Sequence, residues 1–249
     1  MPPNLMVVPA FNEEENLPRL LAELETRPEL FPGGSVLFVV DDGSADSTPL
    51  IVSSYDGPLP VELVRLERNQ GPGAAFRAGF DAALSRARSD EAEGALVVTL
   101  EADTTSDLDA VPRMIERARG DADVVLASWV MVNVPLARRL LSAGAGAFVR
   151  SLLGVDAKTV SSFLRVYRVG ALERAVARHG DDLIRESGFA CKAELLAKLA
   201  ALGVCIEEVP VDLDTSQRVG KSKMPIARTF VAYWRMAFRQ WRARGTAPA

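Results

Sequence analysis

Two acidic side chains, Glu101 and Asp103, follow an apolar segment at residues 96–100 and are separated by one small residue. Alternate residues of an extended strand share a face, so both carboxylates can meet one hard cation at the edge of a sheet. Mg²⁺ or Mn²⁺ is often held by one or two carboxylates and completes its shell with water and substrate phosphates. The pair therefore suggests an anchor for a nucleotide diphosphate. The alternative is a polar loop after a buried strand.

Polar side chains also follow two other apolar segments. Asn12 and Glu13 come just after the first segment, and Asp41 and Asp42 come just after the second. In a parallel sheet, ligands bind beyond the carboxyl ends of the strands. Acids at three strand ends therefore predict one binding edge. No Gly-x-Gly-x-x-Gly follows the first strand and no Gly-Lys-Ser/Thr loop occurs, so dinucleotide-binding and P-loop sites are poorly supported.

Apolar strands alternate with helical patterns along the first half of the chain. Strands that are apolar throughout indicate a mostly parallel sheet covered on both faces, which predicts an α/β fold. The expected strands are 5–9, ending at Pro9, then 35–40, 61–66, 95–100 and about 124–127, and the expected helices are about 14–25, 71–84 and 108–119. The second half predicts helices over 134–153, 194–202 and 225–244, a strand or strand entry at 161–168, and a strand at 204–211 ending at Pro210.

The composition fits one large domain. Of the 249 residues, 48% are hydrophobic and 25% are charged, which allows a sizeable core and excludes a disordered chain. The two cysteines, Cys191 and Cys205, and the lack of a secretory signal predict a reduced, cytoplasmic setting. The single histidine excludes a multi-histidine zinc site. No run of about 18 or more apolar residues occurs, so no transmembrane helix is expected.

The net charge of −4 conceals a basic C-terminal end. After Asp214 the chain has no acid and eight lysines and arginines, which carry +8 and leave −12 for the rest. This end predicts an anionic partner, such as a pyrophosphate, a lipid phosphate or a membrane surface. A nucleic-acid partner is not expected, because the charge is confined to one end and no stacking-rich recognition motif accompanies it.

The predicted helix over 225–244 carries an aromatic stripe among its arginines. A helix of this kind is typical of a membrane interface, which would make the protein peripheral at the inner face of the membrane. The alternative is packing onto the rest of the chain or onto a second copy, in a homodimer. We therefore expect a domain over 1–224 and a basic amphipathic helix and tail over 225–249. The stripe has i, i+4, i+8 and i+11 spacing and consists of Phe230, Trp234, Phe238 and Trp241.

Seven short motifs lie in order between about residues 5 and 224. They are Val-Pro-Ala-Phe-Asn-Glu-Glu-Glu-Asn (8–16), Val-Val-Asp-Asp-Gly-Ser-Ala-Asp-Ser-Thr (39–48), Asn-Gln-Gly-Pro-Gly-Ala-Ala (69–75), Glu-Ala-Asp (101–103), Ser-Phe-Leu-Arg-Val-Tyr-Arg (162–168), Gly-Phe-Ala-Cys-Lys-Ala-Glu (188–194) and Arg-Val-Gly-Lys-Ser-Lys (218–223). Together they resemble the family 2 glycosyltransferases of the GT-A fold, and within them the polyprenyl-phosphate (dolichol-phosphate) mannose synthase-like group. The resemblance implies a Rossmann-like α/β domain with a mostly parallel sheet flanked by helices.

The resemblance further implies inverting transfer from a nucleotide-diphosphate sugar, with Mg²⁺ or Mn²⁺ as the cofactor. Asp103 and Glu101 would be the metal ligands, and Arg218 and Lys223 would lie in a loop over the pyrophosphate. The implied nucleoside pocket consists of Pro9, Phe11, Glu13, Val40 and Asp42. The implied diphosphate and sugar site consists of Glu101, Ala102, Asp103, Thr105, Arg218 and Lys223. For Asp41 a helix cap is an alternative to ligand contact, and Gly71 and Gly73 either allow close backbone approach or simply begin a helix.

The acceptor implied by the group is a polyprenyl phosphate, and Arg165 and Arg168 resemble its acceptor-side groups. A lipid phosphate is already anionic at neutral pH and needs no strong general base. A sugar hydroxyl would need a nearby carboxylate, for which Glu194, Glu186 and Asp182 are candidates. The expected catalytic residues are Asp103, Arg218, Lys223 and Glu194.

Two positions depart from the group's pattern. Glu101 stands where its metal motif begins with aspartate, and Trp129 stands where it commonly has an arginine near the donor. Both differences fall around the diphosphate and sugar and leave two alternatives open. The same fold would act on a soluble acceptor in secondary metabolism, or it would bind a nucleotide sugar without turnover as a subunit.

Overall fold

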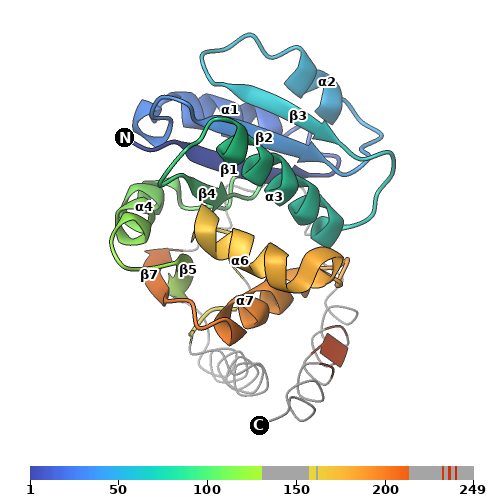
Figure 1. Cartoon of the computed structure of the whole chain (residues 1–249). Helices are drawn as coiled ribbons and strands as arrows, with labels where there is room; N and C mark the ends of the chain where they lie inside the picture. Colours follow the sequence, from blue (N-terminus) through green and yellow to red (C-terminus); the bar gives the residue numbers. More distant parts are fainter. Residues whose placement is uncertain (131–156, 161, 213–231, 233–234, 237–238, 240–249) are drawn as a thin grey trace.

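The computed structural model describes residues 1–130, 157–160, 162–212, 232, 235, 236 and 239. Within them a seven-stranded sheet has the order β3-β2-β1-β4-β6-β5-β7 (Figure 1). Its strands are β1 (Asn4–Ala10), β2 (Val36–Asp41), β3 (Val61–Arg65), β4 (Leu96–Thr99), β5 (Val124–Val130), β6 (Arg165–Arg168) and β7 (Ile206–Asp212). Neighbouring strands pair in parallel, except that β6 runs antiparallel to both β4 and β5.

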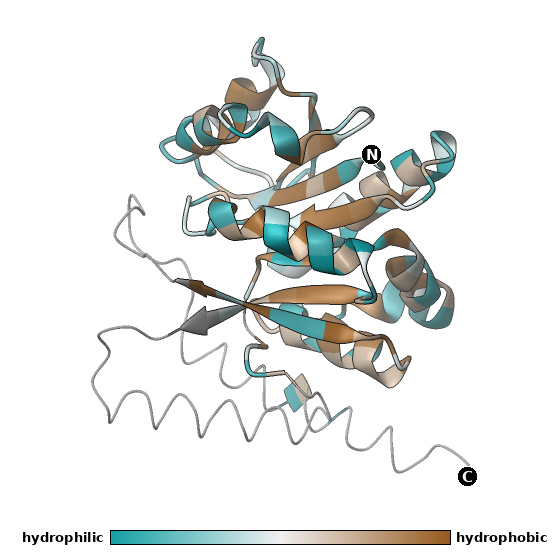
Figure 2. Cartoon of the chain, turned by 90° about the vertical axis from the view of Figure 1, so that its left-hand side faces the viewer, coloured by the Kyte–Doolittle hydropathy of each residue, from teal (hydrophilic) through white to brown (hydrophobic). Residues whose placement is uncertain are grey.

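Helices cover both faces of this sheet. Leu5 and Val7 of β1 pack into one hydrophobic core with residues of α3, α6 and α7, whereas Met6 and Val8 pack into a second core with residues of α1 and α4. This alternation has the period of a strand, and it explains why β1 is apolar on both faces. The strands are largely brown in Figure 2, where the helices carry many teal residues. The helices are α1 (Leu17–Glu25), α2 (Thr48–Ser53), α3 (Pro72–Ser89), α4 (Val111–Arg119), α6 (Val169–His179) and α7 (Cys191–Ala201).

Neither proline that was expected to end a strand does so. Pro9 lies inside β1 and is the register partner of Val40. The carbonyl of Val7 accepts the N–H of Leu100, and the pairing of β1 with β4 ends at Val7. In a strand the backbone groups of residues 7 and 9 point toward the same neighbour, which here is β4. Because the pairing with β4 ends at Val7, the missing N–H of Pro9 removes no hydrogen bond from the sheet. Pro210 lies inside β7, an edge strand, where proline is tolerated.

The expected α/β domain with a mostly parallel sheet is confirmed. Across the described parts of the chain, none of the helices combines the length and hydropathy that crossing a bilayer requires. The helix expected over 134–153 lies outside the described residues. The division between 1–224 and 225–249 falls there too and stays a prediction.

Candidate functional site

The acids that follow β1, β2 and β4 lie along one edge of the sheet, which we call the acid edge. They are Glu13, Asp41, Asp42, Glu101 and Asp103. β2, β1 and β4 are adjacent and parallel, so their carboxyl ends point the same way. The turn after β1 is joined to the turn after β2 by hydrogen bonds from the N–H of Asn12 to Ser44 Oγ at 2.8 Å and from the N–H of Glu13 to Thr48 Oγ1 at 2.7 Å. The predicted binding edge therefore exists as two connected loops beside the end of β4.

Glu13 and Val40, two members of the expected nucleoside pocket, are largely buried. The Glu13 carboxylate accepts a hydrogen bond from Asn16 Nδ2 at 2.7 Å, and Glu13 is 8% exposed. The Val40 side chain is fully buried among core residues. Pro9 and Phe11 are partly exposed near the carboxyl end of β1. Pro9 and Phe11 are thus the members of this set that present apolar surface at the edge.

Asp42 ties the end of β2 to the start of α3. Its two carboxylate oxygens accept the backbone N–H groups of Gln70 and Gly71, each at 2.8 Å. Burial raises the pKa of Asp42 because it disfavours the charged carboxylate, although the two hydrogen bonds act in the opposite direction. Asp41 is fully buried and accepts the N–H of Ser44 at 2.9 Å, so it fixes the turn after β2 rather than capping α2.

Gly71 and Gly73 combine the two expected roles. They flank the start of α3, and Gly71 has a φ of 90°. The N–H of Gly73 donates to the carbonyl of Ser187 at 2.9 Å, and a Cβ on Gly73 would lie 2.0 Å from the carbonyl oxygen of Glu186. Only glycine allows this approach, so the loop before α7 packs directly on the loop that Asp42 holds.

Thr105 connects the two acids beyond β4. Its hydroxyl lies 2.6 Å from Asp103 Oδ1 and 3.2 Å from Glu101 Oε2. Within the described residues no group of three or more His, Cys, Asp or Glu side chains is arranged to hold a metal ion. A set of two carboxylates and a hydroxyl nevertheless fits Mg²⁺ or Mn²⁺, because these ions commonly take few protein ligands and complete their shell with water and phosphate oxygens. Ala102, between the acids, is buried.

Arg165 and Arg168 do not lie together. In the register of β6 with β4, Arg165 is opposite Thr99 and Arg168 is opposite Leu96, at the other end of the strand. Arg165 is 1% exposed, and its guanidinium donates to three backbone carbonyl oxygens, those of Val160, Ser162 and Lys192, at 2.8–2.9 Å. Its donors are committed to holding the chain around β6.

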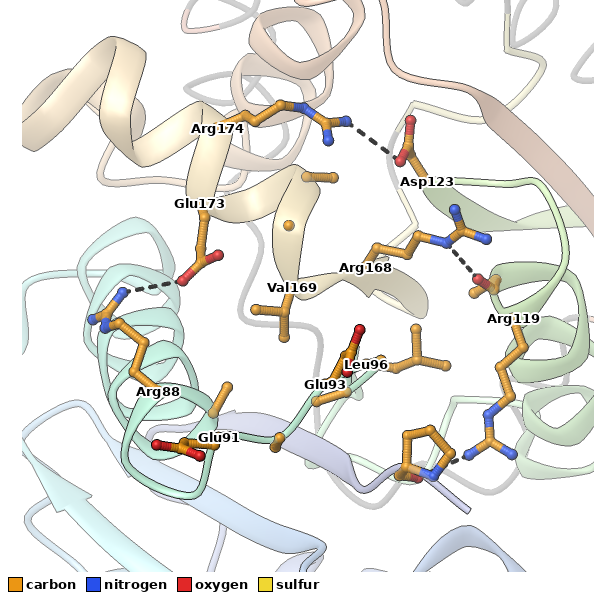
Figure 3. Close-up of a pocket in the computed structure, with 18 residues that line it drawn as sticks. Arg88, Glu91, Glu93, Leu96, Arg119, Asp123, Arg168, Val169, Glu173 and Arg174 are labelled. Atoms are coloured by element: carbon orange, nitrogen blue, oxygen red, sulfur yellow. Dashed lines mark hydrogen bonds and ion pairs between the residues drawn. The ribbon is translucent and has the colours of Figure 1, made fainter.

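Arg168, the last residue of β6, lines a pocket near the amino ends of β4 and β5. This pocket has a volume of about 800 Å³, and Figure 3 shows Arg168 in its wall. The Arg168 guanidinium donates to the carbonyl oxygens of Ala118 and Gly120. Nearby walls contain the ion pair of Arg174 with Asp123 at 3.3 Å. The antiparallel direction of β6 thus separates Arg168 from the acid edge, and the structure does not support it as a group of the donor–acceptor site.

Glu194 holds the loop that packs on Gly73. Its Oε2 accepts the N–H groups of Arg185 and Glu186 at 2.9 and 2.8 Å, and its Oε1 accepts from Lys198 Nζ at 2.7 Å. Glu194 is 3% exposed, so its arrangement is that of a positioning group and not of an exposed base. Asp182 is exposed and pairs with Arg185.

Several expected site residues lie outside the described part of the chain or only partly within it. Arg218 and Lys223 lie outside it, and so does the Trp129 side chain. Of the segment 225–244 the structure describes residues 232, 235, 236 and 239. Met236 is buried in the core and Arg239 bonds to Glu186, so these residues pack onto the domain.

One charged residue near the acids received no role from the sequence. Lys192 is buried at the start of α7, and its Nζ lies 3.5 Å from the centroid of the Phe163 ring. In the sequence, Lys192 is the one charged residue among the small and apolar residues of 188–193, which is a pattern that indicates a buried charge. The motif 188–194 was interpreted through Glu194 alone.

Comparison with known proteins identifies the family of the chain and several relatives. The model of glycosyl transferase family 2 matches residues 6–175. The chain is 30% identical to undecaprenyl-phosphate mannosyltransferase of Micrococcus luteus over 226 residues, which cover 88% of this chain and 86% of that protein. It is 28% identical to polyprenol monophosphomannose synthase of Mycolicibacterium smegmatis over 249 residues, which cover 97% and 87%.

Solved structures share the fold at lower identity. Glucosyl-3-phosphoglycerate synthase from Mycobacterium tuberculosis in complex with uridine diphosphate superposes with a TM-score of 0.67 at 17% identity, over 96% of this chain and 80% of that one. The same enzyme in complex with Mn²⁺, UDP-glucose and phosphoglyceric acid gives a TM-score of 0.63 at 18% identity, over 100% and 81%.

Proposed function

Since the chain belongs to glycosyl transferase family 2, we propose that it transfers a sugar from a nucleoside-diphosphate sugar to a polyprenyl phosphate, with Mg²⁺ or Mn²⁺ held chiefly by Asp103. The observation that carries the proposal is the gathering of Asp103, Glu101 and the Asp42 loop at one edge of the sheet. The names of the two relatives, both matched over most of their length, support the lipid acceptor.

Different residues at this edge would bind the nucleoside and the diphosphate of the donor. Asp42 and the turn after β2 hold the loop that would border the nucleoside, and Pro9 and Phe11 offer it apolar surface. The Thr105 hydroxyl holds the Asp103 carboxylate, which would bind the donor diphosphate through a divalent ion. A divalent ion bound there would offset the negative charge of the leaving nucleoside diphosphate. Arg218 and Lys223 would add positive charge to the same group.

The acceptor side needs no general base under this proposal. A polyprenyl phosphate already carries the nucleophilic oxygen as an anion, whereas a sugar hydroxyl must lose a proton. Glu194 is occupied by two backbone N–H groups and Lys198, which supports a phosphate acceptor over a hydroxyl. The segment 225–244 would bring the enzyme to a membrane surface through its arginines and aromatic residues.

A second candidate is the same reaction on a soluble acceptor. Glu101, in place of the aspartate that the family motif has, favours it, because it changes the surroundings of the donor diphosphate. A binding subunit without turnover would share this feature.

The test is transfer from radiolabelled sugar nucleotides to polyprenyl phosphate in vesicles, with GDP-mannose as the first donor and UDP-glucose as the second. We expect label in the butanol-extractable lipid. Asp103→Asn should lower the rate at least about a hundredfold, because it weakens the ion's main ligand. Asp107→Asn is the matched control, since Asp107 caps the short helix Leu108–Ala110 and should leave the rate unchanged. Label only in water-soluble product contradicts the lipid acceptor, and no transfer from any donor contradicts the activity.

A further inference from the structure

Three residues of the basic C-terminal end attach it to the loop before α7. The guanidinium of Arg239 pairs with Glu186 Oε1, and Arg235 Nη2 lies 3.9 Å from Glu186 Oε2. Met236, between the two arginines in the chain, is 1% exposed and belongs to the hydrophobic core that α3, α6 and α7 share. Glu186 is 6% exposed, so both oxygens of a largely buried carboxylate face arginines from this end of the chain.

The point of attachment is connected to the acid edge. The N–H of Glu186 donates to Glu194 Oε2 at 2.8 Å, and the carbonyl of the next residue, Ser187, accepts the N–H of Gly73 at 2.9 Å. Gly73 follows the loop that Asp42 holds at the end of β2. The C-terminal end is therefore attached to a loop that contacts the border of the proposed nucleoside site.

The arginines that bind Glu186 are also groups that an anionic membrane attracts. The side chains of Arg235 and Arg239 are 66% and 43% exposed. On the helix predicted over 225–244 they are one turn apart and adjoin the aromatic stripe. Lipid phosphates and the Glu186 carboxylate both accept hydrogen bonds from a guanidinium, so they compete for the same two side chains. Ion pairs to exposed arginines have a small net free energy, which attraction to a charged lipid surface can match.

We propose that the contact of Glu186 with Arg235 and Arg239 is responsive to the membrane: Glu186 holds the arginines in solution, and anionic lipid takes them and releases the loop before α7. This inference rests on the proposed function, which brings the segment 225–244 to a membrane. Since only molecules with an open contact offer both arginines to lipid, the contact lowers the apparent affinity for the membrane in proportion to the open fraction.

The competing arrangement keeps the contact closed at the membrane, so that the segment reaches lipid through its aromatic residues alone. In that case Glu186→Gln changes lipid binding only through the net charge of the protein, as the loss of any acid does. Glu173→Gln is the matched control, because Glu173 pairs with Arg88 at 3.5 Å beside the pocket at the opposite rim. Glu186→Asp keeps the charge, but its side chain is one methylene shorter and weakens the contact.

The experiment measures binding of the full chain to sedimented vesicles made of equal parts of phosphatidylcholine and phosphatidylglycerol. We expect Glu186→Gln to bind these vesicles about fivefold more tightly than Glu173→Gln, because an ion pair no longer opposes binding. Glu186→Asp should bind them more tightly than the wild type by a smaller factor. On vesicles of phosphatidylcholine alone, the two glutamine variants should bind equally.

A double-mutant cycle tests the contact itself. In the wild type, Glu186 and lipid share Arg239, whereas in Glu186→Gln this arginine is available to lipid alone. Arg239→Gln should therefore weaken binding to the anionic vesicles about threefold more in the Glu186→Gln background than in the wild type.

The inference is overturned if Glu186→Gln and Glu173→Gln bind anionic vesicles equally, or if Arg239→Gln has the same effect in both backgrounds. Thermal melting checks that each variant folds. Should Glu186→Gln not fold, the comparison of Glu186→Asp with the wild type decides by the sign of the change. A wild type that binds no anionic vesicle overturns the membrane part of the proposed function along with the inference. Vesicle binding and lipid transfer by the wild type, with equal glutamine variants, overturn the inference alone.

Discussion

Asp42 Oδ2 lies 2.8 Å from the backbone nitrogen of Gly71, and Asp42 Oδ1 lies equally close to that of Gln70. The end of β2 therefore determines where α3 begins, although 28 residues separate Asp42 from Gln70. Asp42 is 3% exposed, so these bonds replace the water that its carboxylate has lost. The loop before α7 packs against the same loop, where Ser187 lies next to Gly71 and Gly73.

Replacing Asp42 by alanine should lower the free energy of unfolding by about 2 kcal/mol, because two partly buried N–H groups lose their acceptor. Urea denaturation measures the loss. Asp46→Ala is the matched control, since Asp46 also accepts two backbone N–H groups, those of Glu14 and Thr48, but at a more exposed position. We expect it to cost about half as much, and equal losses would contradict a special role for Asp42.

Thr105→Val should weaken Mn²⁺ binding in the presence of a nucleoside diphosphate by about tenfold. The hydroxyl fixes Asp103, and groups that orient a metal ligand typically matter to this extent. Thr105→Ser keeps the hydroxyl and should bind Mn²⁺ almost as the wild type does. Calorimetric titration distinguishes the two, and identical affinities for valine and serine would show that Asp103 needs no such support.

Gly73→Ala should lower the free energy of unfolding by about 2 kcal/mol or more, because its Cβ would meet the carbonyl of Glu186. The matched control is Gly170→Ala. Both glycines are the second residue of a helix, and nothing lies within 4 Å of a Cβ at Gly170. Alanine there should be neutral or stabilise by up to about 1 kcal/mol. A destabilised Gly170→Ala with an unaffected Gly73→Ala would refute the close approach.

Arg165→Lys should lower the free energy of unfolding by about 3 kcal/mol, because an ammonium cannot reach the three carbonyl oxygens that the guanidinium spans. Arg168→Lys, at a partly exposed position, should cost less than about 1 kcal/mol. Chemical denaturation tests both. If Arg165→Lys is as stable as the wild type while its KM for polyprenyl phosphate rises, Arg165 belongs to the acceptor site after all.

His179 should make the protein less stable in mild acid. Burial lowers the pKa of His179 most, and the charges of Lys198 and Arg178 add to the effect, while Asp182 and Glu194 oppose it. A folded-state pKa below the unfolded value of about 6.5 gives stability that is present above that pH and is lost as pH falls through the folded-state pKa. Between about pH 7.5 and about pH 5, the wild type should therefore lose more unfolding free energy than His179→Gln. Equal losses would contradict this.

The sequence predicted the strands and the acid edge because both have local signals. Continuous apolar runs such as residues 36–40 are typical of parallel strands that are buried on both faces, and the acids after them then share an edge. The helix α6 was not predicted, because only one of its buried positions, Ala171, Leu172 and Ala175, has a large apolar side chain. The helix α2 was not predicted either, because six residues are too few to show a helical hydrophobic period.

The functions of the arginines on β6 could not be read from their spacing. Arg165 and Arg168 are three residues apart, but β6 runs antiparallel to both β4 and β5, which places Arg165 at the acid edge and Arg168 at the opposite rim. No local pattern encodes the direction in which a strand runs. Nor does a pattern distinguish a surface arginine from one whose guanidinium is enclosed by backbone carbonyl groups, because the carbonyl groups belong to segments brought together only by folding.

The reversed strand also places the two ends of β6 in different surroundings. The chain just before Arg165 is buried at the acid edge and held by the Arg165 guanidinium, whereas residues inserted just after Arg168 would extend at the opposite rim. A tag or a fusion partner is therefore better attached at the second position, at a distance from the acids.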